Sequence, residues 1–179
     1  MMEPGLVAFD GQPVLLGELL ELRPLRPDDF DALFAIASDP LIWEQHPASN
    51  RHEPAVFRAF FAEAIASGGA LIALEPATGR VIGSSRFHGY DAARCEVEIG
   101  WTFLGRTHWG GRYNGEMKRL MLDHAFRSVT SVIFVVGVHN LRSQRAVEKI
   151  GAVRDGSRME PDGRTSHVYR VTAPGTGVA

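Results

Sequence analysis

Hydrophobic residues in the first third of the chain recur with two different periods. From Pro13 to Leu25 they alternate with other residues well enough to predict a strand that ends at Pro24. From Phe30 to Ala37 and from Pro54 to Ile65 they recur every three or four residues, which predicts two helices. Aromatic stripes of this kind pack a core more often than they line a site, so we interpret both helices as core elements.

The pattern changes to that of strands after residue 70. Short turns separate three predicted strands, Ala70 to Leu74, Val81 to Tyr90 and Cys95 to Leu104. Turns of this length join neighbouring antiparallel strands, so the three are predicted to form a meander. Alternation along the third strand places Val97, Ile99 and Trp101 on one face and Glu96, Glu98 and Gly100 on the other.

The last third of the chain mixes both patterns. The segment from Ser131 to His139 is apolar on both faces, as is typical of a central strand, and Gly137 within it indicates a bulge or a close approach by another backbone or a ligand. Asn140 is a suitable N-cap for a helix from Leu141 to Ile150. A further helix ends near Phe126, and its apolar stripe consists of Met117, Leu120, Met121 and His124. Two final strands are predicted at about 152–159 and 166–171.

Composition limits the functions that this chain can have. At 179 residues and 45% hydrophobic, it fits a single domain over 1–179, with flexible ends expected at about 1–11 and 173–179. A formal net charge of −2 without a basic run argues against nucleic-acid binding. Because there is neither a bilayer-length apolar run nor a signal segment, we expect no membrane partner and a cytoplasmic location. The oligomeric state stays open, a homodimer included.

The cysteine and histidine content predicts no metal site. Cys95 is the single cysteine, so the chain has neither an internal disulfide nor a CxxC pair. The seven histidines show no HExxH motif and no paired spacing. We interpret Cys95 as a small residue at the start of a strand, because the sequence identifies no base that would activate a catalytic thiol.

A turn from Trp109 to Asn114 joins the third strand to the following helix. Backbone N–H groups in a turn and at a helix N-terminus lack intrahelical partners and lie at the positive end of the helix dipole, so they can hold an anion. Gly110 and Gly111 would let a diphosphate approach the backbone, and Arg112 adds a cation. A plain connection explains the turn equally well, since it lacks the spacing of the GxGxxG and GxxxxGK[ST] loops.

The segment from Asp39 to Pro54 is predicted to be an irregular connection. It contains three prolines together with Trp43, His46 and His52. A loop that carries an aromatic ring and two imidazoles can border a substrate pocket or merely connect two helices, and the sequence leaves both interpretations open.

Three motifs follow one another in the second half of the chain. Residues 98–101 read EIGW, residues 109–114 form the glycine turn, and Asn140, Ser143, Glu148, Lys149 and Gly151 fit the pattern NxxSxxxxEKxG. With the order of predicted elements, these motifs resemble the GNAT N-acetyltransferases from about Leu20 to Val171, most closely the branch of the RimJ and RimL N-terminal acetyltransferases. The resemblance implies an α/β fold of the mixed α+β kind, the GNAT acyl-CoA N-acyltransferase fold, with a central, mostly antiparallel sheet flanked by helices.

The chain departs from the family pattern at four positions. The family loop reads [QR]xxGx[GA], and in this branch it is often WGKGYA. In the corresponding residues 109–114, Arg112 replaces the second glycine of WGKGYA and Asn114 replaces the final Ala or Gly. Many members carry, on the last helix, a tyrosine that can protonate the departing thiolate, and Val147 occupies that position. Ala152 replaces the usual aromatic residue after the glycine that ends this helix.

The resemblance also implies the chemistry: acetyl-CoA as cosubstrate, no metal, and direct attack of a primary amine on the thioester. Glu98 is the implied general base, acting through a water, with Glu96 in reserve and Ser143 as a candidate acid for the thiolate. The N–H of Leu104 or Phe103 is the implied oxyanion donor. The implied cofactor-binding residues are Thr102, Phe103, Leu104, Trp109, Gly110, Gly111, Arg112, Tyr113, Asn114, Asn140 and Ser143.

Other interpretations remain open at this stage. Glu98 can instead be a solvated or ion-paired strand residue, and helix capping alone is sufficient to explain Asn140. The acceptor can be a protein N-terminus or a small-molecule amine. A noncatalytic module that binds acetyl-CoA is the alternative from another functional class, favoured by Arg112, Asn114 and Val147.

Overall fold

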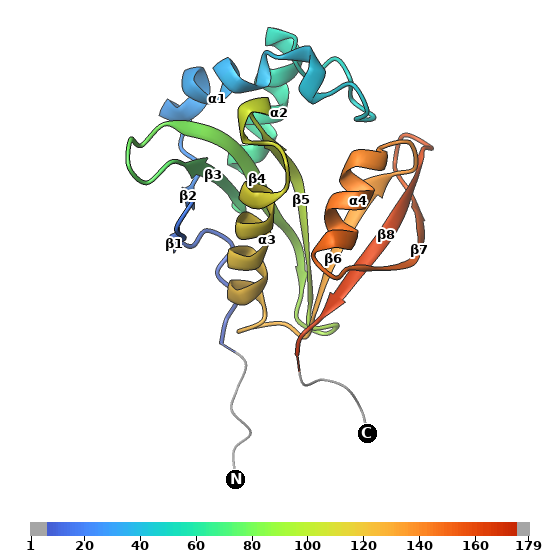
Figure 1. The fold of residues 1–179 in the computed structure, drawn as a ribbon. Coiled ribbons are helices and arrows are strands. Elements are labelled where there is room, and N and C mark those ends of the chain that lie inside the picture. The colour runs from blue at the N-terminus through green and yellow to red at the C-terminus, as the bar shows by residue number, and fades with distance from the viewer. Residues whose placement is uncertain (1–6, 175–179) are drawn as a thin grey trace.

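One mixed sheet organises the chain in a computed structural model that describes residues 7–174 (Figure 1). The described residues form eight strands in the order β1-β2-β3-β4-β5-β6-β8-β7. Only β5 and β6 are parallel among these neighbours. The strands are β1 (Leu15–Leu16), β2 (Glu21–Pro24), β3 (Ala70–Leu74), β4 (Val81–Asp91), β5 (Glu96–Leu104), β6 (Ser131–Gly137), β7 (Val153–Met159) and β8 (Thr165–Thr172). This arrangement confirms the predicted mixed fold with a mostly antiparallel sheet.

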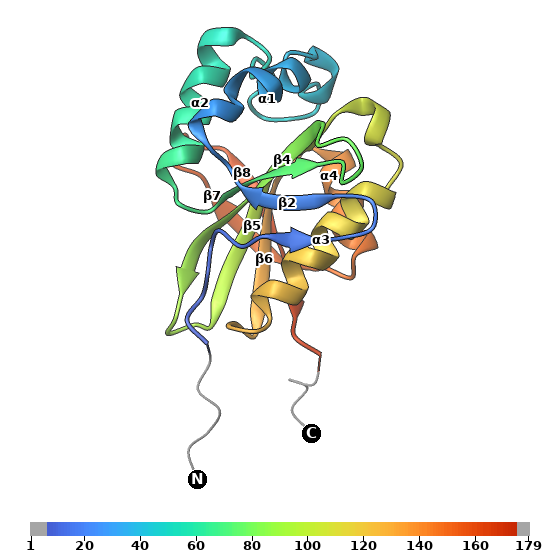
Figure 2. The ribbon, with the colours of Figure 1, turned by 90° about the vertical axis from the view of Figure 1, so that its left-hand side faces the viewer.

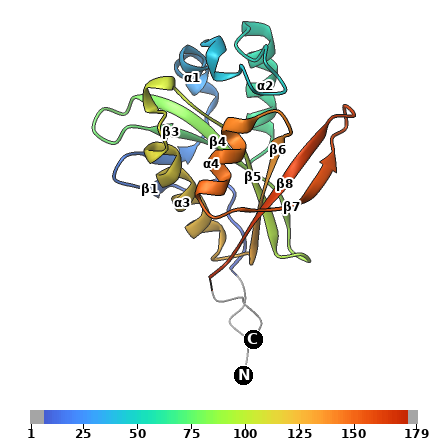
Figure 3. The same cartoon turned by 45° about the vertical axis from the view of Figure 1, so that its right-hand side comes forward.

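Four α-helices in the described part of the chain cover the two faces of the sheet. They are α1 (Phe30–Ala37), α2 (Pro54–Ala66), α3 (Arg112–Ala125) and α4 (Leu141–Lys149). One core cluster joins α3 and α4 to the sheet, and a second joins α1 and α2 to its opposite face. Figure 2 shows α1 and α2 together above the sheet and α3 across β1 and β2, and Figure 3 shows α4 in front of β5 and β6. Three short 3₁₀ turns lie at Pro27–Asp29, Pro40–Ile42 and Arg106–His108.

The predicted N-terminal strand is in fact two strands. The chain reverses between Leu16 and Glu21, so that β1 pairs with β2 in antiparallel fashion. The Glu116 carboxylate of α3 holds this reversal by accepting hydrogen bonds from the N–H groups of Glu18, Leu19 and Leu20 at 3.0, 2.7 and 2.9 Å. The prediction of one continuous strand was wrong because the partner that stabilises the turn lies about a hundred residues away in sequence.

A β-bulge in β5 changes which face its side chains occupy. Trp101 has a φ of 52°, and the register with β4 shifts between Ser84 and Arg86. Before the bulge, Val97 and Ile99 belong to the cluster with α3 and α4. After it, Trp101 packs against the opposite cluster with α1 and α2. The predicted sharing of one face by Val97, Ile99 and Trp101 was therefore wrong, because a bulge reverses the alternation of side chains.

The parallel pair β5 and β6 stays together over a short distance. Its register contains Glu96 with Ser131, Val97 with Val132 and Glu98 with Ile133. Beyond these residues the two strands spread apart, as Figure 1 shows. At the far end of β6, a Cβ on Gly137 would lie 2.7 Å from Cγ of Pro47, so this glycine accommodates a side chain of the 39–54 segment rather than the backbone or ligand that the sequence suggested.

Candidate functional site

The divergence of β5 and β6 opens a cavity of about 1240 Å³. Its walls come from both strands, from α3 and α4, from residues 44–51 and from residues 158–166. Five of the sequence-predicted site residues line it: Glu98, Thr102, Asn114, Asn140 and Ser143. The 39–54 segment does border this cavity, through His46, Pro47 and Arg51 among others. A volume above that of a drug-sized pocket suits a long, flexible ligand.

Glu98 projects into the cavity where the two strands begin to separate. The residue is only 7% exposed, and its carboxylate receives one long hydrogen bond, 3.4 Å, from Nη1 of Arg158. Burial raises the pKa of the Glu98 carboxyl above its ordinary value, and the opposing charge of Arg158 only partly offsets this. A carboxyl with a raised pKa is better matched to proton abstraction near neutral pH than an ordinary glutamate is.

Glu96 is held in a different environment, although it precedes Glu98 by only two residues. Its carboxylate pairs with Arg170 of β8 and lies 3.7 Å from Arg94. The hydroxyl of Ser131 also donates to it at 3.4 Å. Glu96 does not contact the cavity. Its role here is to tie β5 to β6 and β8, which leaves Glu98 as the carboxylate that faces the cavity from β5.

The second half of β5 has one backbone edge that does not pair with β6. The N–H of Gly105 donates to the carbonyl of Ile82 on β4 at 2.9 Å. Because backbone groups alternate along a strand, those of Leu104 and Thr102 point to the other edge, away from β4. The Phe103 side chain packs between Trp43 and the aromatic residues of α2. Of the two predicted oxyanion donors, Leu104 is therefore the one on the open edge.

The glycine turn lies at the N-terminus of α3, where residues 109–113 stay outside the walls of the cavity and Asn114 lines it. Gly110 and Gly111 have φ angles of 109° and 99°, and a Cβ on either would meet nothing within 4 Å. Glycine is needed at both positions for the backbone conformation rather than for space. Gly111 is the N-cap, and no side chain caps the helix. Arg112 and Tyr113 begin the helix, and the Tyr113 ring stacks edge-on against His108.

Trp109 lies beside α4 rather than inside the cavity. Its indole N–H donates to the carbonyl of Leu104 at 3.0 Å, and the guanidinium of Arg142 lies 4.1 Å from the ring centroid. These two contacts connect the end of β5 to the start of α4. Trp109 therefore connects β5 to α4 near the N-termini of α3 and α4.

The start of α4 forms the wall opposite β5. The Asn140 side chain accepts a hydrogen bond from the N–H of Ser143 at 3.2 Å, which confirms its prediction as the N-cap. Ser143, Ala146 and Val147 line the cavity one after another along this helix. Ser143 is the hydroxyl-bearing member of this set, whereas Val147 presents only methyl groups.

Sequence reasoning missed most charged residues of the cavity, and three of these are buried or pair with a predicted site residue. Lys118 on α3 is 3% exposed, and Arg158 on β7 pairs with Glu98. Arg51 lies over the rings of Trp43 and Phe60, and burial lowers its pKa to about 10. Lys118 directly follows the buried Met117 and is not part of the apolar stripe of its helix. The sequence pattern therefore could not show whether this lysine is buried or exposed. Only the position of β5 relative to α3 reveals that it points inward.

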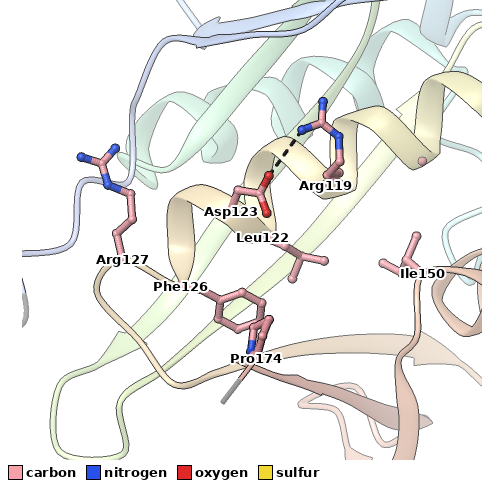
Figure 4. Close-up of a pocket in the computed structure, with 8 residues that line it drawn as sticks. Arg119, Leu122, Asp123, Phe126, Arg127, Ile150 and Pro174 are labelled. Atoms are coloured by element: carbon pink, nitrogen blue, oxygen red, sulfur yellow. Dashed lines mark hydrogen bonds and ion pairs between the residues drawn. The ribbon is translucent and has the colours of Figure 1, made fainter. Parts of the chain in front are cut away.

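A second, smaller hollow of about 450 Å³ lies on the outer side of α3 (Figure 4). It is lined by Leu122, Phe126, Ile150 and Pro174, with the paired Arg119 and Asp123 at its rim. It contains none of the predicted catalytic residues. Within residues 7–174, no group of three or more His, Cys, Asp or Glu side chains could hold a metal ion. No described helix is long and apolar enough to cross a membrane.

Comparisons with known proteins agree with this geometry. A family model described as an acetyltransferase (GNAT) domain matches residues 20–153. A search of curated proteins gave no match. An acetyltransferase structure from T. thermophilus is 29% identical, with a TM-score of 0.70, over 89% of this chain and 88% of its own.

Two further solved structures are less similar in sequence. A GNAT-family structure from Chromobacterium violaceum is 21% identical, with a TM-score of 0.79, over 96% of this chain and 95% of its own. The structure of Mycobacterium smegmatis RimJ in complex with CoA-disulfide is also 21% identical, with a TM-score of 0.68, over 96% of this chain and 93% of its own. These two likenesses show a shared fold. Because the family model spans most of the chain and the fold agrees with it, the chain belongs to the GNAT family of acetyltransferases.

Proposed function

We propose that this protein transfers the acetyl group of acetyl-CoA to a primary amine by direct attack of the amine on the thioester. The observation that carries the proposal is the buried Glu98 carboxyl, which projects into a cavity of about 1240 Å³ between two diverging parallel strands. A cavity of this size has room for an extended thioester along one strand edge and for an amine beside the carboxyl.

The residues at the site fit acetyl-CoA. The N-terminus of α3 has no side-chain cap, so its first N–H groups, at Arg112, Tyr113 and Asn114, can bind a diphosphate. The open edge of β5 at Thr102 and Leu104 can pair with the amide groups of a pantetheine arm as an added strand would. The Leu104 N–H would then stabilise the negative charge that develops on the thioester oxygen.

Glu98 would remove a proton from the amine, directly or through a water. Its raised pKa brings the carboxyl closer to neutral pH, where a base accepts a proton most effectively, while Arg158 keeps the ionised form accessible. On the opposite wall, Asn140 and Ser143 would contact the cofactor, and Asn140 would do so in addition to capping α4.

The acceptor is either a protein N-terminus or a small-molecule amine. The similarity to the structure named RimJ and the EIGW motif at 98–101 favour a protein N-terminus and the RimJ/RimL branch. The cavity is open enough for an extended peptide, since residues 44–51 and 158–166 contribute to its walls. The proposal also includes a cytoplasmic location. It leaves the oligomeric state open between a monomer and a homodimer.

Thiol release from acetyl-CoA in the presence of a panel of amines and peptides tests the function. Wild-type protein is expected to release CoA with at least one amine. The Glu98→Gln variant is expected to lose about 10²- to 10⁴-fold in turnover with nearly unchanged acetyl-CoA affinity, because it removes a base and not a binding group. Tight CoA binding without turnover on any amine would instead identify a noncatalytic module. Unchanged turnover in the variant would remove Glu98 from the mechanism.

A further inference from the structure

One fully buried cation in the cavity has no role in the proposed reaction so far. Lys118 lies on α3 one turn after Asn114, and its side chain extends toward β5. Its Nζ donates to the hydroxyl of Thr102 and, at 3.4 Å, to that of Ser85 on β4. A lysine ammonium has three N–H groups, so these two bonds leave one donor for another acceptor. The ring of Phe134 on β6 lies 5.6 Å from Nζ.

No carboxylate compensates the charge of Lys118 among the residues that the structure describes. A salt-bridge partner would have to come from the elements packed around Lys118. These elements contribute only uncharged side chains near it: Ser85 from β4, Thr102 from β5, Phe134 from β6 and Val147 from α4. Besides Lys118, the cavity walls carry ten titratable or charged groups, and no carboxylate among them pairs with Nζ. They are Glu44, His46, Arg51, Glu63, Glu98 on the opposite face of the sheet, His139 after β6, Arg158, Glu160, Asp162 and Arg164. Burial lowers the pKa of Lys118 to about 7.

An unpaired buried ammonium is costly, and an apolar residue of similar size at this position would avoid the cost. The hydrogen bonds from Nζ to two hydroxyls do not offset the free energy that a fully charged ammonium loses when its hydration shell is removed. Lys118 is therefore positioned where an anion is expected to form. In the proposed reaction, the thioester sulfur becomes an anion when the C–S bond breaks, inside the cavity that Lys118 lines.

We propose that Lys118 receives the departing CoA thiolate and protonates it. This inference rests on the proposed acetyl transfer. The amine nitrogen forms a bond to the thioester carbonyl carbon, the C–S bond breaks, and its electron pair goes to sulfur. Lys118 donates a proton to that sulfur and gives CoA thiol. The ammonium form of the acceptor loses two protons overall: one restores Lys118 through solvent and the other is released.

Lys118 carries the acid function that the last helix lacks. Val147 has no proton to donate, and the Ser143 hydroxyl is a weak acid. An amine with a pKa near 7 transfers its proton downhill to a thiolate, because an ordinary thiol has a pKa of about 8.5. The neutral amine that results is also tolerated in a buried site, so the step does not leave a new buried charge.

The first test titrates the thiol of CoA bound to the protein, which needs no turnover. Thiolate absorbance in the ultraviolet is followed against pH in a Cys95→Ser background, which removes the single protein thiol. With Lys118 present, part of the bound thiol is expected to ionise already near pH 7, where the Lys118 ammonium still stabilises thiolate, whereas in Lys118→Met it should ionise only near the ordinary value of about 8.5. Arg119→Met, the exposed neighbour on α3, is the matched control and is expected to behave like wild type.

The second test measures turnover of the same variants. Lys118→Met is expected to lower kcat about 10²-fold while the KM for acetyl-CoA changes little, because an acid acts in the transition state. The variant should fold, since an apolar isostere of a buried, unpaired charge is neutral or stabilising. If Lys118→Met binds CoA and shows the thiol pKa of wild type, the inference is overturned while the proposed function stands. If wild-type protein binds CoA without turnover, acetyl transfer fails, and the thiol titration still decides whether Lys118 contacts the sulfur.

Discussion

The Glu116 carboxylate provides a quantitative test of how α3 is fixed to the N-terminal strands. It accepts three backbone hydrogen bonds from the turn between β1 and β2, and its side chain is only 10% exposed. Each hydrogen bond to a charged group contributes about 1.5–3 kcal/mol. Three bonds to one carboxylate do not add fully, so we expect Glu116→Ala to cost about 3–4 kcal/mol.

The two conservative changes should separate charge from shape. In Glu116→Gln, the single amide oxygen can replace Oε2 and still accept from the N–H groups of Leu19 and Leu20. The bond from the N–H of Glu18 to Oε1 is lost, because the amide nitrogen cannot accept it. Its expected cost is about 1–2 kcal/mol. In Gly17→Ala, the new Cβ would lie 2.5 Å from Oε2 of Glu116, so this change disturbs the same anchor from the other side.

Thermal and urea unfolding of these variants measure the effect. A chain of this size loses about 2–4 °C in Tm per kcal/mol, so Glu116→Ala should unfold about 6–16 °C below wild type. Asp123→Ala is the control on the same helix, because it removes only an exposed pair with Arg119 at 3.4 Å and should change stability by less than about 0.5 kcal/mol. Equal losses for Glu116→Ala and Asp123→Ala would refute the anchor. So would strictly additive effects of Gly17→Ala and Glu116→Ala in a double-mutant cycle.

Two further predictions concern residues of the cavity. Asn140→Ala should cost about 1 kcal/mol of stability through loss of the α4 cap, as measured by urea unfolding, and calorimetry with CoA then tells whether the residue also binds the cofactor. Because burial raises the pKa of Glu98, the folded protein binds a proton there more tightly than the unfolded chain does, so stability falls as pH rises above 4.5. Glu98→Gln should therefore be the more stable protein at pH 7 and should lose this advantage below about pH 4, where both side chains are neutral; a Tm difference that does not change with pH would contradict this.

Local pattern was sufficient for most elements and for the position of several candidate site residues. The helices from Phe30 and from Pro54, the strand Ala70–Leu74 and the Asn140 cap were predicted with nearly correct bounds. Each depends on residues within a few positions of one another, which periodicity and capping rules describe well. The placement of Glu98 also followed from its strand, although its burial depends on elements from other parts of the chain.

The errors arose where distant segments decide the local structure. The break between β1 and β2 depends on Glu116, and the inward orientation of Lys118 depends on β5 crossing beneath α3. The bulge at Trp101 requires a positive φ in a bulky residue, which no propensity scale favours. Such strain is retained only when the surrounding structure enforces it, and it is frequent at functional sites.

The bulge also explains how two opposite charges can share one cavity without neutralising each other. Without it, alternation along β5 would place Thr102 on the same face as Glu98, and Lys118, which α3 holds on the other face, would lose this hydroxyl partner. A nearby ion pair would lower the pKa of the glutamate and raise that of the lysine, which is the reverse of what a base and an acid near neutral pH require. With the bulge, Glu98 and Lys118 reach the cavity from opposite faces, and burial moves both pKa values toward neutrality. Removing the bulge should therefore impair both proton transfers together, even if each side chain is retained.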